Sequence, residues 1–266
     1  MIKFLILFFA ASTTWAKCEL PPEESIKIGC SYECGFANSL RLKIAASLTG
    51  HKVELIDMGT DLAKINQVDA FLIPGGADIH PRIYRDQVDK YAQKRIDDFS
   101  SYYRPSKEGE SRDIFESQLL KLYNEEEKFA YVPLLGICRG MQMMGVAQGL
   151  PLYQDIEAEL KIPNREYLFD KVDIPQGPTI MSAIFPSGKF YATKYHHQGI
   201  SVPYYFSNHE RFSRVRLTAF SHDKKIAEAI EYSHRPALGV QFHPEYSLPS
   251  DIFEWFLNKA CEYKIN

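Results

Sequence analysis

The sequence predicts an α/β fold in which a doubly wound, mainly parallel sheet is flanked by helices. From Ile26 onward, short apolar segments alternate with longer amphipathic ones, which is the pattern of helices packed on a parallel sheet. The 266 residues are 45% hydrophobic and 24% charged, values typical of a chain that buries a full core. This length favours one domain rather than two.

Four buried strands are expected in the first half of the chain, because short apolar runs there end in turn residues. Helical spacing predicts a helix between the first two, with Leu40, Ile44 and Leu48 on one face. The predicted strands are residues 26–30, 53–56, 70–73 and 132–137, and the predicted helices are 38–49, 112–127 and one starting at Arg139.

The second half is richer in strands and ends in an amphipathic helix. The strands are expected at residues 190–193, 215–219, 227–231 and 238–242, and the helix at 250–261. Residues 82–109 are rich in Tyr, Asp, Lys and Arg with weak periodicity. We expect them to form a helix and a loop over one edge of the strand ends.

Residues 1–16 have the features of a cleaved export signal. Lys3 supplies a positive charge, an apolar run extends from Phe4 to Ala11, and Ala16 is a small residue at the expected cleavage point. Residues 17–266 would then form the mature single domain, secreted or periplasmic. An uncleaved anchor is the alternative, but the run is short and no later segment approaches the roughly 20 apolar residues of a membrane span.

The charges exclude one class of partner. The chain has 34 acidic and 31 basic residues, and they are scattered along its length. Without a basic stripe, binding of nucleic acid is not expected. The sequence leaves the oligomeric state open, and a homodimer is compatible with it.

Five cysteines are present, and an exported protein could pair four of them. Cys138 is the one expected to stay free. Cys30 and Cys34 are close enough to form a disulfide or to be two buried thiols, and Cys18 with Cys261 would tie the termini together. A zinc site is disfavoured because no second Cys or Cys/His pair accompanies them at ligand spacing.

The segment Gly136-Ile137-Cys138-Arg139-Gly140 has the layout of a nucleophile elbow. In such an elbow a strand turns directly into a helix, and the flanking glycines leave room for the tight turn. The sulfur of Cys138 would stand above the strand ends, where the N-terminus of the helix favours the thiolate. A buried structural cysteine in a glycine-rich turn is the alternative interpretation.

A second strand leads to His243-Pro244-Glu245. Residues two apart in an extended chain face the same way. His243 could therefore take a proton from Cys138 while Glu245 orients the imidazole, as in a catalytic triad. Alone, the segment would be read as an ordinary surface turn; its position after the elbow, at the end of another strand, favours the triad.

The strand at residues 70–73 ends in Pro74-Gly75-Gly76. A glycine pair at a strand end can direct backbone amides at a ligand. The amides of Gly76 and Arg139 would form an oxyanion hole for acyl transfer. As an isolated segment, Pro-Gly-Gly is more often an ordinary turn.

From about Ile26 to Cys261, the chain resembles the γ-glutamyl hydrolase branch of the class I glutamine amidotransferase-like superfamily, and especially its γ-glutamyl-γ-aminobutyrate hydrolase type. The fold implied is flavodoxin-like. The matching segments are the elbow, His243-Pro244-Glu245, residues 74–81, Arg112-Asp113 with Glu116, and His196-His197-Gln198-Gly199-Ile200.

This resemblance implies that a γ-glutamyl amide is hydrolysed through a thioester on Cys138, with His243 as base and Glu245 as its partner. It also implies that Gly76 and Arg139 form the oxyanion hole, that His197 and Gln198 line the substrate pocket, and that no metal or organic cofactor is needed. Asp113 and Glu116 could be read as paired catalytic carboxylates, but their helical spacing favours a structural role, capping the helix or pairing with Arg112.

Two departures and two rival functions qualify this expectation. The loop Ser31-Tyr32-Glu33-Cys34-Gly35 and the Tyr-rich residues 82–109 differ from the family pattern and could reshape the pocket mouth. One rival is a glutaminase subunit that feeds a synthase, which an export signal disfavours. The other is a catalytically silent γ-glutamyl or amino-acid binding protein, which the intact set of Cys138, His243 and Glu245 disfavours.

Overall fold

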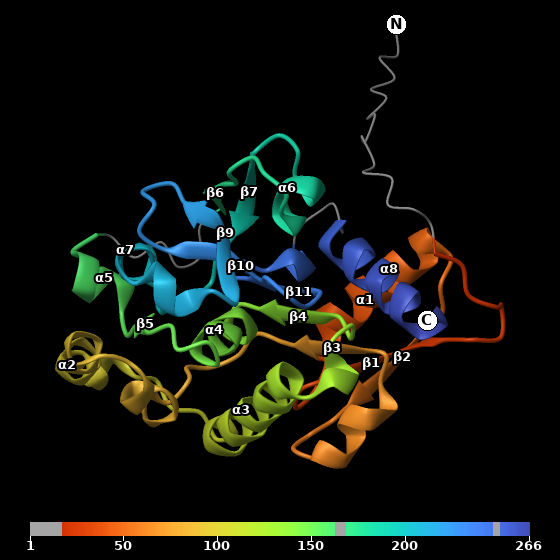
Figure 1. Cartoon of the computed structure of the whole chain (residues 1–266), viewed down its shortest axis with the longest axis horizontal. Coiled ribbons are helices and arrows are strands. Elements are labelled where there is room, and N and C mark those ends of the chain that lie inside the picture. The colour runs from red at the N-terminus through yellow and green to blue at the C-terminus, as the bar shows by residue number, and fades with distance from the viewer. Residues whose placement is uncertain (1–17, 163–168, 247–250) are drawn as a thin grey trace, which may run out of the picture.

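The computed structural model describes residues 18–162, 169–246 and 251–266. The expected signal segment, residues 1–16, lies outside this range. A nine-stranded sheet in the order β2-β1-β3-β4-β11-β10-β9-β6-β7 forms the centre of the molecule (Figure 1). Its strands are β1 (Ile26–Cys30), β2 (Val53–Asp57), β3 (Ala70–Ile73), β4 (Leu134–Ile137), β6 (Phe169–Asp173), β7 (Lys189–Thr193), β9 (Val215–Ser221), β10 (Ala227–Tyr232) and β11 (Ala237–Val240).

The sheet has a parallel half and an antiparallel half. Strands β2, β1, β3, β4 and β11 pair in parallel, whereas β10, β9, β6 and β7 continue the sheet with antiparallel pairings. The predicted α/β fold with a parallel sheet is confirmed for the five strands from β2 to β11, and the antiparallel strands extend this sheet. Strand β6 was not predicted, because its sequence, Phe-Asp-Lys-Val-Asp, is mostly polar and partly exposed near the sheet edge.

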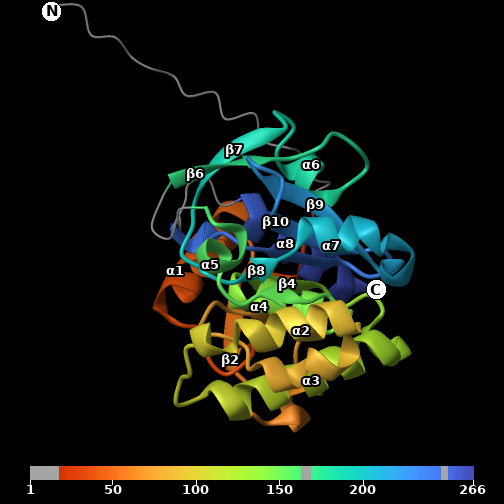
Figure 2. The ribbon, with the colours of Figure 1, turned by 90° about the vertical axis from the view of Figure 1, so that its left-hand side faces the viewer.

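Helices cover both faces of the sheet, as the doubly wound prediction requires (Figure 1). On one face lie α1 (Phe36–Thr49) and α8 (Asp251–Ile265), which share an apolar core. On the other face lie α3 (Gly109–Glu125) and α4 (Arg139–Val146), with a second core. Figure 2 shows α2 in the same layer as α3. The remaining helices are α2 (Lys90–Asp98), α5 (Ile156–Leu160), α6 (Ile180–Ile184) and α7 (Val202–Ser207).

Helix α1 packs through a different face from the one suggested by its large apolar residues. Leu40, Ile44 and Leu48 do share a face, but they are 47%, 39% and 67% exposed. The buried side of α1 is formed by residues that include Leu42 and Ala45. The reason is steric: α1 lies against α8, and small side chains permit a close approach of two helices.

Two disulfides settle the cysteine alternatives. Cys30 is bonded to Cys34, and Cys18 is bonded to Cys261, while Cys138 is a buried free thiol. The second bond attaches the start of the described chain to α8. Within the described residues, no helix combines the length and apolar character needed to cross a bilayer.

A short antiparallel pair of strands, β5 (Leu152–Tyr153) and β8 (Gly199–Ile200), lies outside the main sheet. Between β7 and β8, residues 194–198 form a connection that we call the β7–β8 strap. The strap passes beside the carboxyl end of β4, because the carbonyl oxygen of Tyr195 lies 3.9 Å from Cys138 Sγ. It therefore forms part of the wall around the free thiol.

Candidate active site

A cavity of about 530 Å³ opens at the carboxyl ends of the parallel strands. Ligand sites of open α/β sheets are expected at this position. Its walls come from the segments that follow β1, β3, β4 and β11, together with the β7–β8 strap and the start of α3. The residues that concern the chemistry are Gly75, Gly76, Arg112, Cys138, Arg139, Tyr195, His243 and Glu245.

Cys138 occupies the turn between β4 and α4. Its φ of 52° and ψ of −105° are unusual for a residue with a side chain, and such strain is typical of a nucleophile elbow. The turn depends on close packing, because a Cβ at Gly140 would collide with the carbonyl of Ile73, and one at Gly136 with the sulfur of Met144 and the backbone of Gly140. The predicted elbow is therefore present, with its thiol at the cavity.

His243 and Glu245 meet as the sequence predicts. His243 Nδ1 lies 2.6 Å from Glu245 Oε1, and both residues are buried. Burial lowers the pKa of His243, but the hydrogen bond and charge of Cys138, together with Glu245, outweigh it and raise the pKa to about 10. This electrostatic environment favours the imidazolium form of His243.

Two tyrosines flank the His243 ring. The Tyr195 ring stands nearly perpendicular to it at a centroid distance of 6.3 Å, and the Tyr246 ring is tilted at 5.6 Å. Both tyrosines line the cavity. They restrict the orientation of the imidazole in addition to the hydrogen bond that Glu245 accepts.

Arg112 holds the Pro74-Gly75-Gly76 loop in place through hydrogen bonds to its backbone. The guanidinium donates to the carbonyl oxygens of Pro74 at 2.8 Å and Gly75 at 3.1 Å. Because the C=O and N–H of a planar trans peptide point in opposite directions, the amide of Gly76 points away from Arg112. The amide of Arg139, in the first turn of α4, has no acceptor within its own helix.

The side chain of Arg139 turns away from the cavity into the protein. This side chain is 2% exposed, and its guanidinium is hydrogen-bonded to Asp113 and Glu116 of α3. Glu116 also accepts from Arg112 Nε at 2.7 Å. Burial raises the pKa of Glu116, but Arg139 and Arg112 hold it below its ordinary value. The predicted pairing with Arg112 is confirmed for Glu116, whereas Asp113 pairs with Arg139, a partner that the sequence did not indicate.

His197 and Gln198 lie in the β7–β8 strap but are not in the wall of this cavity. His197 Nε2 lies 2.9 Å from Asp78 Oδ1, and Nδ1 lies 3.3 Å from Asp155 Oδ2. Burial opposes its charging, but Asp78 raises the pKa of His197. The two aspartates therefore hold the strap in place through the His197 ring. A direct contact of His197 or Gln198 with substrate stays a prediction.

Two buried glutamines near Cys138 were missed in the sequence. Gln241 Nε2 lies 3.6 Å from Cys138 Sγ, and Gln241 Oε1 accepts from Gln142 Nε2 at 3.2 Å. Gln142 also donates to the carbonyl of Gln198 in the strap at 3.0 Å. A polar residue inside the apolar run Val240-Gln241-Phe242 was the available signal for this network.

Comparison with known proteins agrees with this geometry. The family model of peptidase C26 matches residues 57–245, which is more than half of the chain. The chain belongs to the peptidase C26 family. The matched range includes the elbow, the β7–β8 strap and the segment with His243 and Glu245.

Two relatives match about three quarters of this peptidase C26 chain. Protein NtpR of Enterococcus hirae is 27% identical over 216 residues, covering 75% of this chain and 78% of that protein. The γ-glutamyl-γ-aminobutyrate hydrolase of Escherichia coli O157:H7 is 26% identical over 217 residues, covering 75% and 74%. A glutamine amidotransferase from Thermotoga maritima has the same fold, with a TM-score of 0.52, 14% identity and coverage of 91% of this chain and 87% of that chain.

These findings confirm the resemblance to the class I glutamine amidotransferase-like superfamily. They identify this peptidase C26 chain as a glutamine amidotransferase-like hydrolase.

Proposed function

We propose that this protein is an exported cysteine hydrolase that cleaves γ-glutamyl amide bonds through a thioester on Cys138. The observation that carries the proposal is the meeting of a free thiol on a strained elbow with a buried His243–Glu245 pair in one cavity. The γ-glutamyl preference comes from the relatives named γ-glutamyl-γ-aminobutyrate hydrolase.

In the first half of the reaction, the Cys138 thiolate attacks the γ-carbonyl carbon and a carbon–sulfur bond forms. The negative charge on the carbonyl oxygen is received by the amides of Gly76 and Arg139, which supply the oxyanion hole. His243 then gives its proton to the amide nitrogen. The carbon–nitrogen bond breaks, an amine leaves, and a γ-glutamyl thioester remains on Cys138.

In the second half, neutral His243 takes a proton from water, and the resulting hydroxide attacks the thioester. The carbon–sulfur bond breaks, glutamate leaves, and the thiolate and imidazolium are restored. Glu245 stabilises the charged imidazole in both halves through its bond to Nδ1. No step of this sequence requires a metal.

Export is supported by two features. Residues 1–16 have the composition of a signal segment, and two disulfides suit an oxidising compartment. Because the export signal would separate the protein from cytoplasmic synthases, we favour a hydrolase that acts alone over a glutaminase subunit.

The test is the release of glutamate from a panel of γ-glutamyl amides and glutamine by residues 17–266. Cys138→Ala should reduce kcat/KM by about 10⁴-fold or more, and Glu245→Gln by about 10²- to 10⁴-fold. The matched control is Glu127→Gln, at an exposed glutamate outside the cavity, which should leave the rate unchanged. Full activity in Cys138→Ala would refute the mechanism.

Labelling with iodoacetamide separates the rival functions if the panel gives no product. A reactive Cys138 would then point to another acyl substrate, because the thiolate is the nucleophilic form. An unreactive Cys138 would favour a binding protein without catalytic activity.

A further inference from the structure

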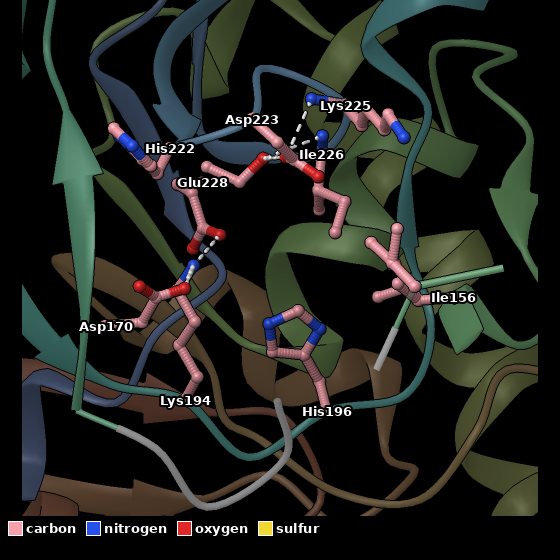
Figure 3. Close-up of a pocket in the computed structure, with 11 residues that line it drawn as sticks. Ile156, Asp170, Lys194, His196, His222, Asp223, Lys225, Ile226 and Glu228 are labelled. Carbon is pink, nitrogen blue, oxygen red and sulfur yellow. Dashed lines mark hydrogen bonds and ion pairs between the residues drawn. The ribbon is translucent and has the colours of Figure 1, made fainter. Parts of the chain in front are cut away.

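A second cavity, of about 280 Å³, lies behind the β7–β8 strap (Figure 3). Tyr195 lines the cavity of Cys138, whereas its neighbours Lys194 and His196 line the second cavity. The strap is therefore a wall between the two. Nothing in the mechanism above uses this second cavity.

The polar side of the second cavity has an excess of negative charge. Lys194 Nζ lies between the carboxylates of Glu228 and Asp170, and donates to both (Figure 3). Burial raises the pKa of Glu228 to about 6, although Lys194 opposes this rise, so the carboxyl is mainly ionised at neutral pH. One cation between two carboxylates leaves a net charge of about −1, and Asp223 and Lys225, which also line the cavity, carry opposite charges and do not change it.

Two hydrogen-bond acceptors at this cavity have capacity to spare. Glu228 is fully buried, yet its Oε2 has no hydrogen-bond partner among the described residues. The His196 ring has Nδ1 at 2.7 Å from the carbonyl of Gln198, so Nδ1 carries the proton and Nε2 is an acceptor. Burial, with help from Lys194, lowers the pKa of His196 to about 3, which keeps the ring neutral.

The cavity also has an apolar part, next to which Asp223 and Lys225 line it. Ile156 of α5 and Ile226 before β10 face the polar groups across it (Figure 3). An unpartnered buried acceptor costs free energy unless a donor reaches it. These features favour a ligand with a cationic, hydrogen-donating head and a short apolar body.

We propose that this second cavity binds a small primary ammonium ion carried on a short alkyl chain. The ammonium donates to Glu228 Oε2 and His196 Nε2, and the chain packs on Ile156 and Ile226. An anion is disfavoured by the net negative charge. A metal ion is disfavoured because, in the described parts of the chain, these acceptors do not converge at ligand distances.

The probe is n-butylammonium chloride, titrated into the disulfide-bonded chain of residues 17–266 at neutral pH and followed by calorimetry. Butyrate and 1-butanol, which have the same chain length, are the anionic and neutral controls. We expect binding of n-butylammonium alone. Absence of binding, or equal binding of 1-butanol, would overturn the proposal.

Glu228→Gln removes the negative charge with little change of shape and should weaken n-butylammonium binding at least tenfold. The matched control is Glu231→Gln, a buried glutamate on the same strand that caps α6 and does not line the cavity. It should leave binding unchanged, as should Cys138→Ala. Unaltered affinity in Glu228→Gln, or loss of affinity in Cys138→Ala, would place the amine elsewhere.

A measurement on the unmutated chain makes the test independent of whether Glu228→Gln folds. The Nε2 resonance of His196 in ¹⁵N spectra should move as n-butylammonium is added, because the ammonium donates to that atom. A resonance that stays constant at saturation would refute the proposed site.

Discussion

At the scale of single residues, the reactivity of the site depends on a few side chains in constrained positions. Cys138 has a positive φ and stands where the strand ends and the helix begins. His243 is held by Glu245 on one ring nitrogen and interacts with Cys138. The charged state of His243 therefore depends on Cys138 and Glu245.

Cys138→Ala should lower the pKa of His243 from its value of about 10. The substitution removes the hydrogen bond and the negative charge that favour the imidazolium, and leaves burial, which favours the neutral ring. Titration of His243 by NMR in the variant and in the unmutated protein measures this directly. A pKa of His243 that stays near 10 would mean that Glu245 alone sustains the charge.

The raised pKa of His243 also determines how the stability of the folded protein changes with pH. Its folded-state pKa lies above the ordinary value of 6.5. The corresponding stabilisation is therefore fully present below pH 6.5 and is lost as pH rises through about 10. The proposed hydrolysis should decline in the same alkaline range, because imidazolium is the acid for the leaving amine.

At the scale of elements, the β7–β8 strap forms a wall between the two cavities, and the His197 ring holds this strap in place. His197 joins Asp78, which follows β3, to Asp155, which precedes α5. Gln142 of α4 adds a bond to the strap backbone. These contacts hold Tyr195 against Cys138 and keep Lys194 in the second cavity.

His197→Ala should destabilise the protein by about 2 kcal/mol, the scale of hydrogen bonds to charged groups. Because the pKa of His197 is raised, the difference from the unmutated protein should be largest below pH 6.5 and shrink as pH rises through the folded-state pKa. Urea denaturation over a pH series measures it. The kcat/KM for glutamate release should also fall.

The matched control is His222→Ala. His222 faces Asp173, but its side chain is 64% exposed, and an exposed pair of this kind contributes little. Equal losses of stability in both variants would contradict the pinning role of His197.

At the scale of the whole molecule, helices cover both faces of the sheet, and two disulfides add covalent links between parts of the chain. The Cys18–Cys261 bond spans 243 residues, whereas Cys30–Cys34 spans only 4. The first attaches the N-terminal segment to α8. The second lies in the loop after β1, and Cys34 lines the cavity of Cys138.

Removing the long bond should cost more stability than removing the short one. By loop-closure entropy, the double substitution of Cys18 and Cys261 by Ser should cost roughly 5–6 kcal/mol, and that of Cys30 and Cys34 roughly 2 kcal/mol. Denaturant unfolding of the two variants gives the comparison. The reverse order would show that local strain or packing, rather than chain entropy, dominates.

Much of the parallel half and of the proposed triad could be predicted because the signals are local. Buried parallel strands are short apolar runs, the elbow needs glycines beside Cys138, and the spacing of His243 and Glu245 puts them on one side of an extended chain. Strand β6 could not be predicted in this way, since a partly exposed strand near a sheet edge has no apolar run.

The amino-acid sequence by itself determined the parallel α/β core, the elbow and the identity of the free thiol, because each depends on neighbouring residues. Only the tertiary structure decided the antiparallel half of the sheet, the disulfide pairing, the contact of Gln241 with Cys138 and the second cavity at Glu228. These features join residues far apart in the chain, and their partners are chosen by packing and charge rather than by local pattern.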